Sequence, residues 1–158
     1  MRSTRCACSL SYCGKGCDRP SPWHRNIARS LLQAPKVYLT DAGLVKGDGG
    51  VRFENAVAVM LRKQVHHLVD TRGCDAGLHY IRTKDGAEVD FSLSLEGSLT
   101  HLVECKLVHS SPHRALLRFA LQFQEAEVVQ LVRDTRQQVQ RGAVAVVPAG
   151  EWLARLPV

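Results

Sequence analysis

The sequence predicts an α/β fold in which helices flank a mixed central sheet. Two observations carry this prediction. The periodic segments follow the order helix, three-strand meander, helix, strand, strand, and turn residues separate the strands of the meander. The composition agrees, because 45% of the 158 residues are hydrophobic and 23% are charged, which excludes wholesale disorder and a coiled coil. A chain of this length corresponds to one domain.

The first residues differ from the rest in composition. Residues 1–18 are polar, rich in Gly and Cys, and without helical or strand periodicity, so we expect a disordered leader followed by a single domain at residues 19–158. Zinc binding by the leader stays open beside free thiols, although no C-x-x-C pair is present. The four thiols concerned are Cys6, Cys8, Cys13 and Cys17.

Targeting signals are missing from the sequence. The leader has no apolar stretch of the kind found in signal peptides, and no segment approaches the roughly 18 apolar residues of a membrane span. We therefore expect a cytoplasmic protein without a membrane partner.

The segments before the meander are short until one clear helix. Residues 24–33 show a brief helical pattern, and residues 36–40 alternate like a short strand. Residues 41–50 contain four glycines and indicate a loop. From residue 51 to residue 65, apolar side chains recur at helical spacing, which predicts a helix with one buried face.

The meander is defined by its turns. Residues 78–82 alternate as a strand, and Lys84-Asp85-Gly86 is a hairpin signal before the strand predicted at 87–95. A second turn at 96–98 leads into a third strand at 99–108, which is apolar enough to be central.

A helix and two strands complete the sheet. Ser111 is a suitable N-cap, with Pro112 at the first position of a helix over residues 112–124. The remaining segments are two apolar strands, the polar connection between them and a short terminal helix, at residues 127–132, 143–147, 133–142 and around Trp152.

Ionisable residues interrupt the apolar segments at a few positions. Glu104 and Lys106 lie two apart in the third strand, so both point to the same face. Asp90 belongs to the polar side of the preceding strand, and antiparallel pairing would bring it near Glu104. Glu54 shares a side of its helix with apolar residues, so we expect it to face the sheet.

The charges of these four groups do not balance. Three acids and one lysine leave an excess of about two negative charges, which is costly in a half-buried site unless protons or a cation neutralise it. Hard oxygen ligands favour Mg²⁺ or Mn²⁺, and such an ion beside a lysine suits phosphodiester hydrolysis. The alternative is a structural ion network, in which Lys106 pairs with one acid and Arg82 or Arg52 with the others.

The arrangement of Glu on the first helix, Asp on the second strand and Glu-x-Lys on the third resembles the PD-(D/E)XK nuclease superfamily. The order of elements resembles its restriction-endonuclease-like αβββαβ core. Longer words over about residues 19–156 resemble the C-terminal domain of a large family of prokaryotic AAA+-type ATPases, a domain of unknown function that is itself considered nuclease-like. The words are PSPWHRNIARSLLQAPKVYLTDAGL, VRFENAVAVML, LHYIRTKDGAEVDF and HLVECKL.

The resemblance implies a role for each residue of the pattern. It implies that Asp90 and Glu104 bind the metal, with the carbonyl of Cys105 as a further ligand. It implies that Lys106 is the catalytic lysine and that Glu54 is the first-helix acid.

Some features stay outside this assignment. Arg82 matches an arginine before the hairpin whose role the resemblance leaves open. Residues 1–18 match nothing in the family, and the segment between Leu44 and Val51 is shorter than is usual there.

Two functions are compatible with these observations. The first is a Mg²⁺- or Mn²⁺-dependent nuclease that acts on DNA, a partner that the net charge of +6 also favours. The second is a non-catalytic module that binds DNA or a protein and regulates or tethers an ATPase. No G-x-x-x-x-G-K-[ST] motif occurs, so we expect neither ATP binding nor ATP hydrolysis by this chain.

Overall fold

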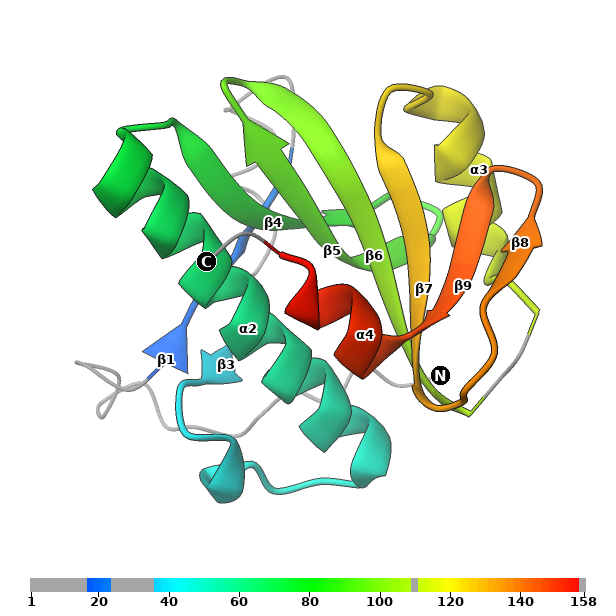
Figure 1. Ribbon diagram of the computed structural model, residues 1–158, viewed down its shortest axis with the longest axis horizontal. Coiled ribbons are helices and arrows are strands. Elements are labelled where there is room, and N and C mark those ends of the chain that lie inside the picture. Colours follow the sequence, from blue (N-terminus) through cyan, green and yellow to red (C-terminus); the bar gives the residue numbers. More distant parts are fainter. Residues whose placement is uncertain (1–16, 24–35, 109–110, 157–158) are drawn as a thin grey trace.

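A computed structural model describes residues 17–23, 36–108 and 111–156 of the chain. Its centre is a mixed sheet of six strands, extended at one edge by the two-residue strand β2 (Ser21–Pro22). The six strands are β4 (Ala76–Arg82), β5 (Glu88–Leu95), β6 (Ser98–Val108), β7 (Glu127–Asp134), β8 (Val139–Arg141) and β9 (Val144–Pro148). The sheet order is β2-β4-β5-β6-β7-β9-β8 (Figure 1), which confirms the predicted α/β class.

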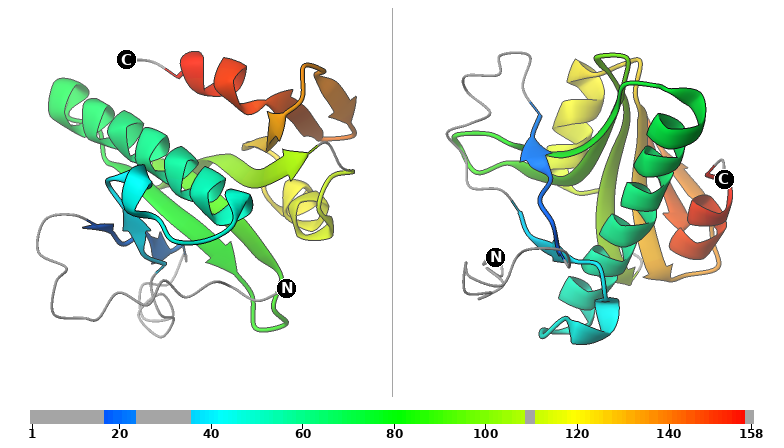
Figure 2. Two further views of the ribbon diagram at one scale, coloured as in Figure 1. Left: turned by 90° about the horizontal axis from the view of Figure 1, so that it is seen from below. Right: turned by 90° about the vertical axis from the view of Figure 1, so that its left-hand side faces the viewer.

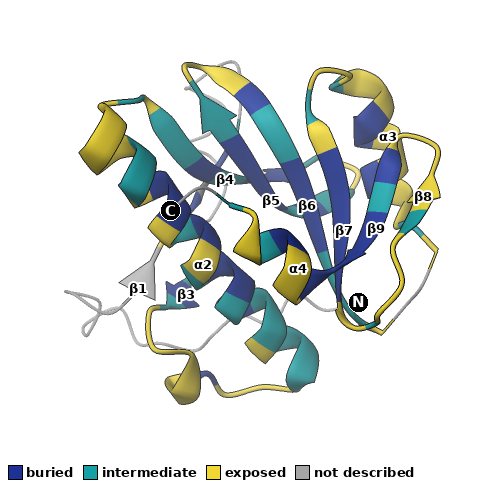
Figure 3. Ribbon diagram, in the orientation of Figure 1, coloured by how far each residue is buried: buried dark blue, intermediate teal, exposed yellow. Residues whose placement is uncertain are grey.

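Helices cover both faces of this sheet. Within the described residues there are three α-helices, which are α2 (Gly49–Arg72), α3 (Arg114–Gln122) and α4 (Ala149–Ala154). Figure 2 shows α2 and α4 against one face and α3 against the other. Each face has its own apolar core, and the central strands between the two cores are buried along most of their length (Figure 3).

The long helix α2 has well-defined ends. The Asp48 side chain accepts a hydrogen bond from the N–H of Val51 at 3.0 Å, and Gly73 ends the helix in the left-handed conformation with φ 64°. The helix continues seven residues beyond the predicted range 51–65, into two turns that are mostly exposed and in which Leu68 is half-buried. Its buried face packs on the sheet through residues such as Leu61, which is fully buried.

The meander forms as predicted. Strands β4, β5 and β6 pair antiparallel in sequence, whereas β7 joins β6 in parallel and β9 joins β7 in parallel. The turn between β5 and β6 consists of Glu96 and Gly97, both with positive φ, which is the backbone that a two-residue hairpin turn requires.

Two predictions in the C-terminal half are wrong. Ser111 does not cap α3; the N-cap is His113, whose backbone N–H donates to Gln130 Oε1 at 3.0 Å. The polar connection 133–142 also contains a strand, β8, which pairs antiparallel with β9. An exposed edge strand of three residues has no apolar alternation by which the sequence could reveal it.

The segment before α2 differs from the prediction in two ways, because its strand is shorter and the predicted loop 41–50 contains a short helix and the start of α2. The strand expected at 36–40 is β3 (Tyr38–Leu39), which pairs antiparallel with β1 (Cys17–Asp18). A short 3₁₀ helix, η1 (Ala42–Leu44), follows. Residues 1–16, with three of the four leader cysteines, and the predicted helix 24–33 lie outside the described residues. In the described ranges, no helix has the length and apolar character needed to cross a bilayer.

Candidate functional site

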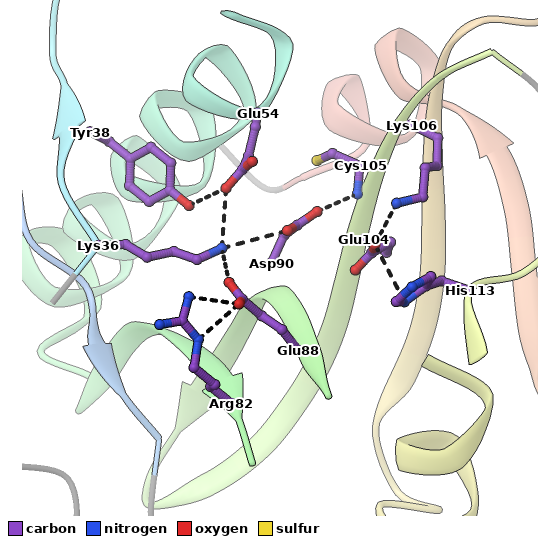
Figure 4. A network of polar contacts seen from close by, with 10 residues as sticks. All are labelled: Lys36, Tyr38, Glu54, Arg82, Glu88, Asp90, Glu104, Cys105, Lys106 and His113. Atoms are coloured by element: carbon purple, nitrogen blue, oxygen red, sulfur yellow. Dashed lines mark hydrogen bonds and ion pairs between the residues drawn. The ribbon is translucent and has the colours of Figure 1, made fainter. Parts of the chain in front are cut away.

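Polar side chains from six segments meet where β5 and β6 separate (Figure 4). The segments are the chain from Lys36 into β3, the first turns of α2, the end of β4, the beginning of β5, the second half of β6 and the N-cap of α3. All four residues of the predicted catalytic set lie in this region, and the structure adds five further polar partners. The added residues are Lys36, Tyr38, Arg82, Glu88 and His113.

Lys36 is the centre of one half of the site. Its ammonium group lies close to three carboxylates, at 2.7 Å from Glu88 Oε1, 3.2 Å from Glu54 Oε1 and 3.5 Å from Asp90 Oδ1. Only 13% of its side chain is exposed. Burial alone would lower the pKa of Lys36, but the three carboxylates outweigh it and raise the pKa well above the ordinary value, so the group remains charged.

Side-chain contacts with α2 hold the segment that carries Lys36. The Asn55 amide bonds to both the N–H and the C=O of Leu39 at 2.8 Å, so the helix side chain replaces a strand partner. The Tyr38 hydroxyl donates to Glu54 Oε1 at 2.6 Å. Burial, followed by the charge of Glu54, raises the pKa of Tyr38, so this hydroxyl keeps its proton and can donate it. Glu54 thus faces the sheet side of α2, as predicted.

Arg82 and Glu88 form an ion pair next to Lys36. Arg82 Nε donates to Glu88 Oε2 at 2.8 Å, and a second guanidinium nitrogen lies 2.7 Å from the same oxygen. Burial would raise the pKa of Glu88, but Lys36 and Arg82 lower it overall, so Glu88 is ionised. The arginine whose role the sequence left open is therefore a partner of Glu88.

Asp90 links the two halves of the site. The β5–β6 ladder reaches the Phe91–Val103 pair, and beyond it the N–H of Cys105 donates to Asp90 Oδ2 at 2.9 Å. Burial, then the charges of Glu104 and Glu54, raise the pKa of Asp90 to about 7. A carboxyl group in this environment exchanges its proton near neutral pH, and any additional cation beside it would favour the ionised form.

Glu104 and Lys106 make up the other half. Lys106 Nζ donates to Glu104 Oε1 at 2.7 Å, and His113 Nδ1 lies 3.7 Å from the same oxygen. The other oxygen, Glu104 Oε2, is buried and has no hydrogen-bond partner. Burial would lower the pKa of Lys106, but Glu104 outweighs it and raises the pKa, which keeps the ammonium charged while a third of its side chain remains exposed.

The charge count from the sequence left out Lys36, Arg82 and Glu88, which together add one positive charge and reduce the excess from about two negative charges to about one. Lys36 and Arg82 together neutralise most of the charge of the acids around Lys36. Burial, followed by repulsion from Glu104 and Glu54, still raises the pKa of Asp90. In the sequence, Lys36 is a single lysine before a short alternating segment, and this pattern is too weak to predict that Lys36 pairs with Glu54.

The candidate site offers few side-chain ligands for a metal ion. In the part of the chain that the structure describes, no three His, Cys, Asp or Glu side chains are placed to hold a metal ion. The ligand set expected from the sequence needs only two carboxylates, Asp90 and Glu104, with the backbone carbonyl of Cys105. Glu104 Oε2 fits this set, because it is a buried anionic oxygen without a hydrogen-bond donor.

Comparison with known proteins adds one match. A family model with the description "Domain of unknown function (DUF4143)" matches residues 49–152, a range that contains Glu54, Asp90, Glu104 and Lys106. The comparisons with curated proteins and with solved structures gave no match.

Proposed function

The chain belongs to the DUF4143 family of domains, and we propose that it is a divalent-metal-dependent phosphodiester hydrolase that acts on DNA, with a core related to the PD-(D/E)XK nucleases. One observation carries the proposal. Glu104 Oε2 is buried without a hydrogen-bond partner, on the strand that also carries Lys106 and next to the ionisable Asp90. An unpartnered anionic oxygen in such a place is costly, and a hard cation would offset that cost.

Each residue has a definite part in this proposal. Asp90 and Glu104, with the carbonyl of Cys105, would hold Mg²⁺ or Mn²⁺. When bound, the metal would polarise a phosphoryl oxygen and lower the pKa of a bound water. Lys106 is charged and partly exposed, so it serves to stabilise negative charge on the phosphate and not as a proton acceptor. Glu54 stays outside the metal shell and holds Lys36 and Tyr38.

A second candidate function rests on Lys36. Because Lys36 and Arg82 already balance most of the charge of Glu54 and Glu88, that half of the site is stable without a metal. The second candidate is therefore a non-catalytic module that binds DNA or a protein and regulates or tethers an AAA+-type ATPase. In such a module the network would only stabilise the fold. The sequence contains no G-x-x-x-x-G-K-[ST] motif, so neither proposed function assigns ATP binding to this chain.

Cleavage of plasmid DNA distinguishes the two functions. The wild type should nick supercoiled DNA in Mn²⁺ and not in EDTA, whereas Asp90→Asn and Lys106→Ala should not. Lys63→Ala is the matched control, because Lys63 is an exposed lysine on α2 and its loss changes the net charge equally. Cleavage that persists in Lys106→Ala contradicts the proposed role of this lysine. DNA binding without cleavage in any metal supports the non-catalytic module.

A further inference from the structure

A second concave site lies at the other end of α2. A cavity of about 450 Å³ opens between the C-terminal half of α2, the ends of β5 and β6 that are remote from Asp90, and α4. Gln64 lines it and is ten residues from Glu54 on the same helix, which is about 15 Å along the axis. The cavity is therefore separate from the candidate nuclease site, and its volume is typical of pockets that hold small ligands.

The walls of the cavity are mostly apolar. Val65 and Leu68 come from α2, Leu93 from β5, and Trp152 and Leu156 from α4 and the residues after it. Leu93 and Trp152 are themselves buried in the core, so this wall is fixed by packing. A ligand with an apolar chain or ring would replace water against these side chains.

One polar group in the wall has no partner. The Gln64 side chain is among the few buried polar side chains, with the residue 8% exposed, and it lines the cavity. Among the described residues, no side chain or backbone group forms a hydrogen bond with its amide. Its amide atoms are not themselves fully buried, so water in the cavity can reach them, and a polar group of a ligand would replace that water as their partner.

The charges around the cavity favour an anion. Arg72 and Arg155 contribute two positive charges, and Glu127 one negative charge. Glu127 is already engaged, because Oε1 accepts a hydrogen bond from Trp152 Nε1 at 2.8 Å. Arg155 is 4.0 Å from Glu151, in an exposed pair that holds it weakly. The arginines are thus able to attract a carboxylate.

We propose that this cavity binds a small amphipathic carboxylate in which a hydrogen-bonding group lies between an apolar tail and the anionic end. The tail contacts Leu93 and Trp152, the hydrogen-bonding group meets the Gln64 amide, and the carboxylate is held at the rim by Arg72 and Arg155. Because this site shares no residue with the Asp90–Glu104 site, the proposal does not depend on nuclease activity.

The test uses N-decanoylglycine as the probe, with two matched analogues. Its methyl ester removes the negative charge, and dodecanoate keeps the carboxylate but has no amide. Titration calorimetry of the wild-type chain should show saturable binding with one site per chain, and the acid should bind more tightly than either analogue. The Arg72→Gln, Arg155→Gln double variant should bind the acid about tenfold more weakly and the ester unchanged.

Three further variants complete the test. Gln64→Leu should remove the preference for N-decanoylglycine over dodecanoate. Leu68→Trp fills the cavity and should weaken binding of all three compounds, whereas Leu121→Trp, at a residue 76% exposed on the opposite face, should not. Absence of saturable binding, or binding that Leu68→Trp leaves unchanged, would overturn the proposal. Equal affinity for acid and ester would overturn the assignment of the arginines.

Discussion

Replacing Asp90 with Asn should stabilise the metal-free domain at neutral pH. Burial, then Glu104 and Glu54, raise the pKa of Asp90 from 3.8 to about 7. Between these two pH values the folded chain keeps a proton that the unfolded chain has lost, so stability falls as the pH rises through this window. A difference of about three pH units, at 1.36 kcal/mol each, corresponds to a loss of about 4 kcal/mol that is complete above pH 7.

The asparagine variant should lack this loss. Its side-chain oxygen can still accept the hydrogen bond from the N–H of Cys105, and it cannot ionise. Urea unfolding in EDTA, from about pH 4 to about pH 8, should show that the free energy of unfolding of the variant rises relative to that of the wild type, by up to about 4 kcal/mol. Asp134→Asn, at an exposed carboxylate paired with Arg133, is the control, and its stability relative to the wild type should not rise with pH. An Asp90→Asn variant that is less stable than the wild type at pH 8 would refute the reasoning.

Two other predictions concern cations and DNA. The Lys36 ammonium lies 3.5 Å from Asp90 Oδ1, the carboxylate oxygen that does not accept the hydrogen bond from Cys105, so it competes with a metal ion for this oxygen. Lys36→Met should therefore raise the Mn²⁺ affinity about tenfold or more. The metal-free variant should lose about 3 kcal/mol in urea unfolding, because carboxylates are left without their cation; an unchanged Mn²⁺ affinity in calorimetry would contradict the competition. Affinity for duplex DNA should fall steeply with salt in fluorescence anisotropy, since the net charge is +6. A flat salt dependence would contradict DNA binding and favour a protein partner.

The meander and its helix could be predicted because their signals are local. The Lys84-Asp85-Gly86 turn and the short connection at Glu96 fix which strands are neighbours, and period-two alternation fixes which side chains share a face. The proximity of Asp90 and Glu104 follows from these two facts alone. In this part of the chain the local sequence signals agree with the final fold, so the sequence was sufficient to predict it.

Long-range contacts explain what the sequence could not show. Lys36 pairs with Glu54, and Asn55 binds the backbone of Leu39 in the same segment; contacts across 18 and 16 residues have no periodic signature. The start of α3 is set by a bond from His113 to Gln130, which removes the need for the cap that Ser111 would have supplied. The alternative prediction is a structural ion network in which Lys106 pairs with one of the acids. The structure shows that this acid is Glu104.

Binding of Mn²⁺ tests the central claim, a metal site at Asp90 and Glu104, most directly. The melting temperature should be measured with and without Mn²⁺ for the wild type, Asp90→Asn and Lys106→Ala. Any ligand that binds only the folded state raises the melting temperature, so the wild type and Lys106→Ala should rise with Mn²⁺ and Asp90→Asn should not. No rise in the wild type, together with a metal-free Asp90→Asn variant that melts well below it, would contradict the metal site and leave a structural ion network.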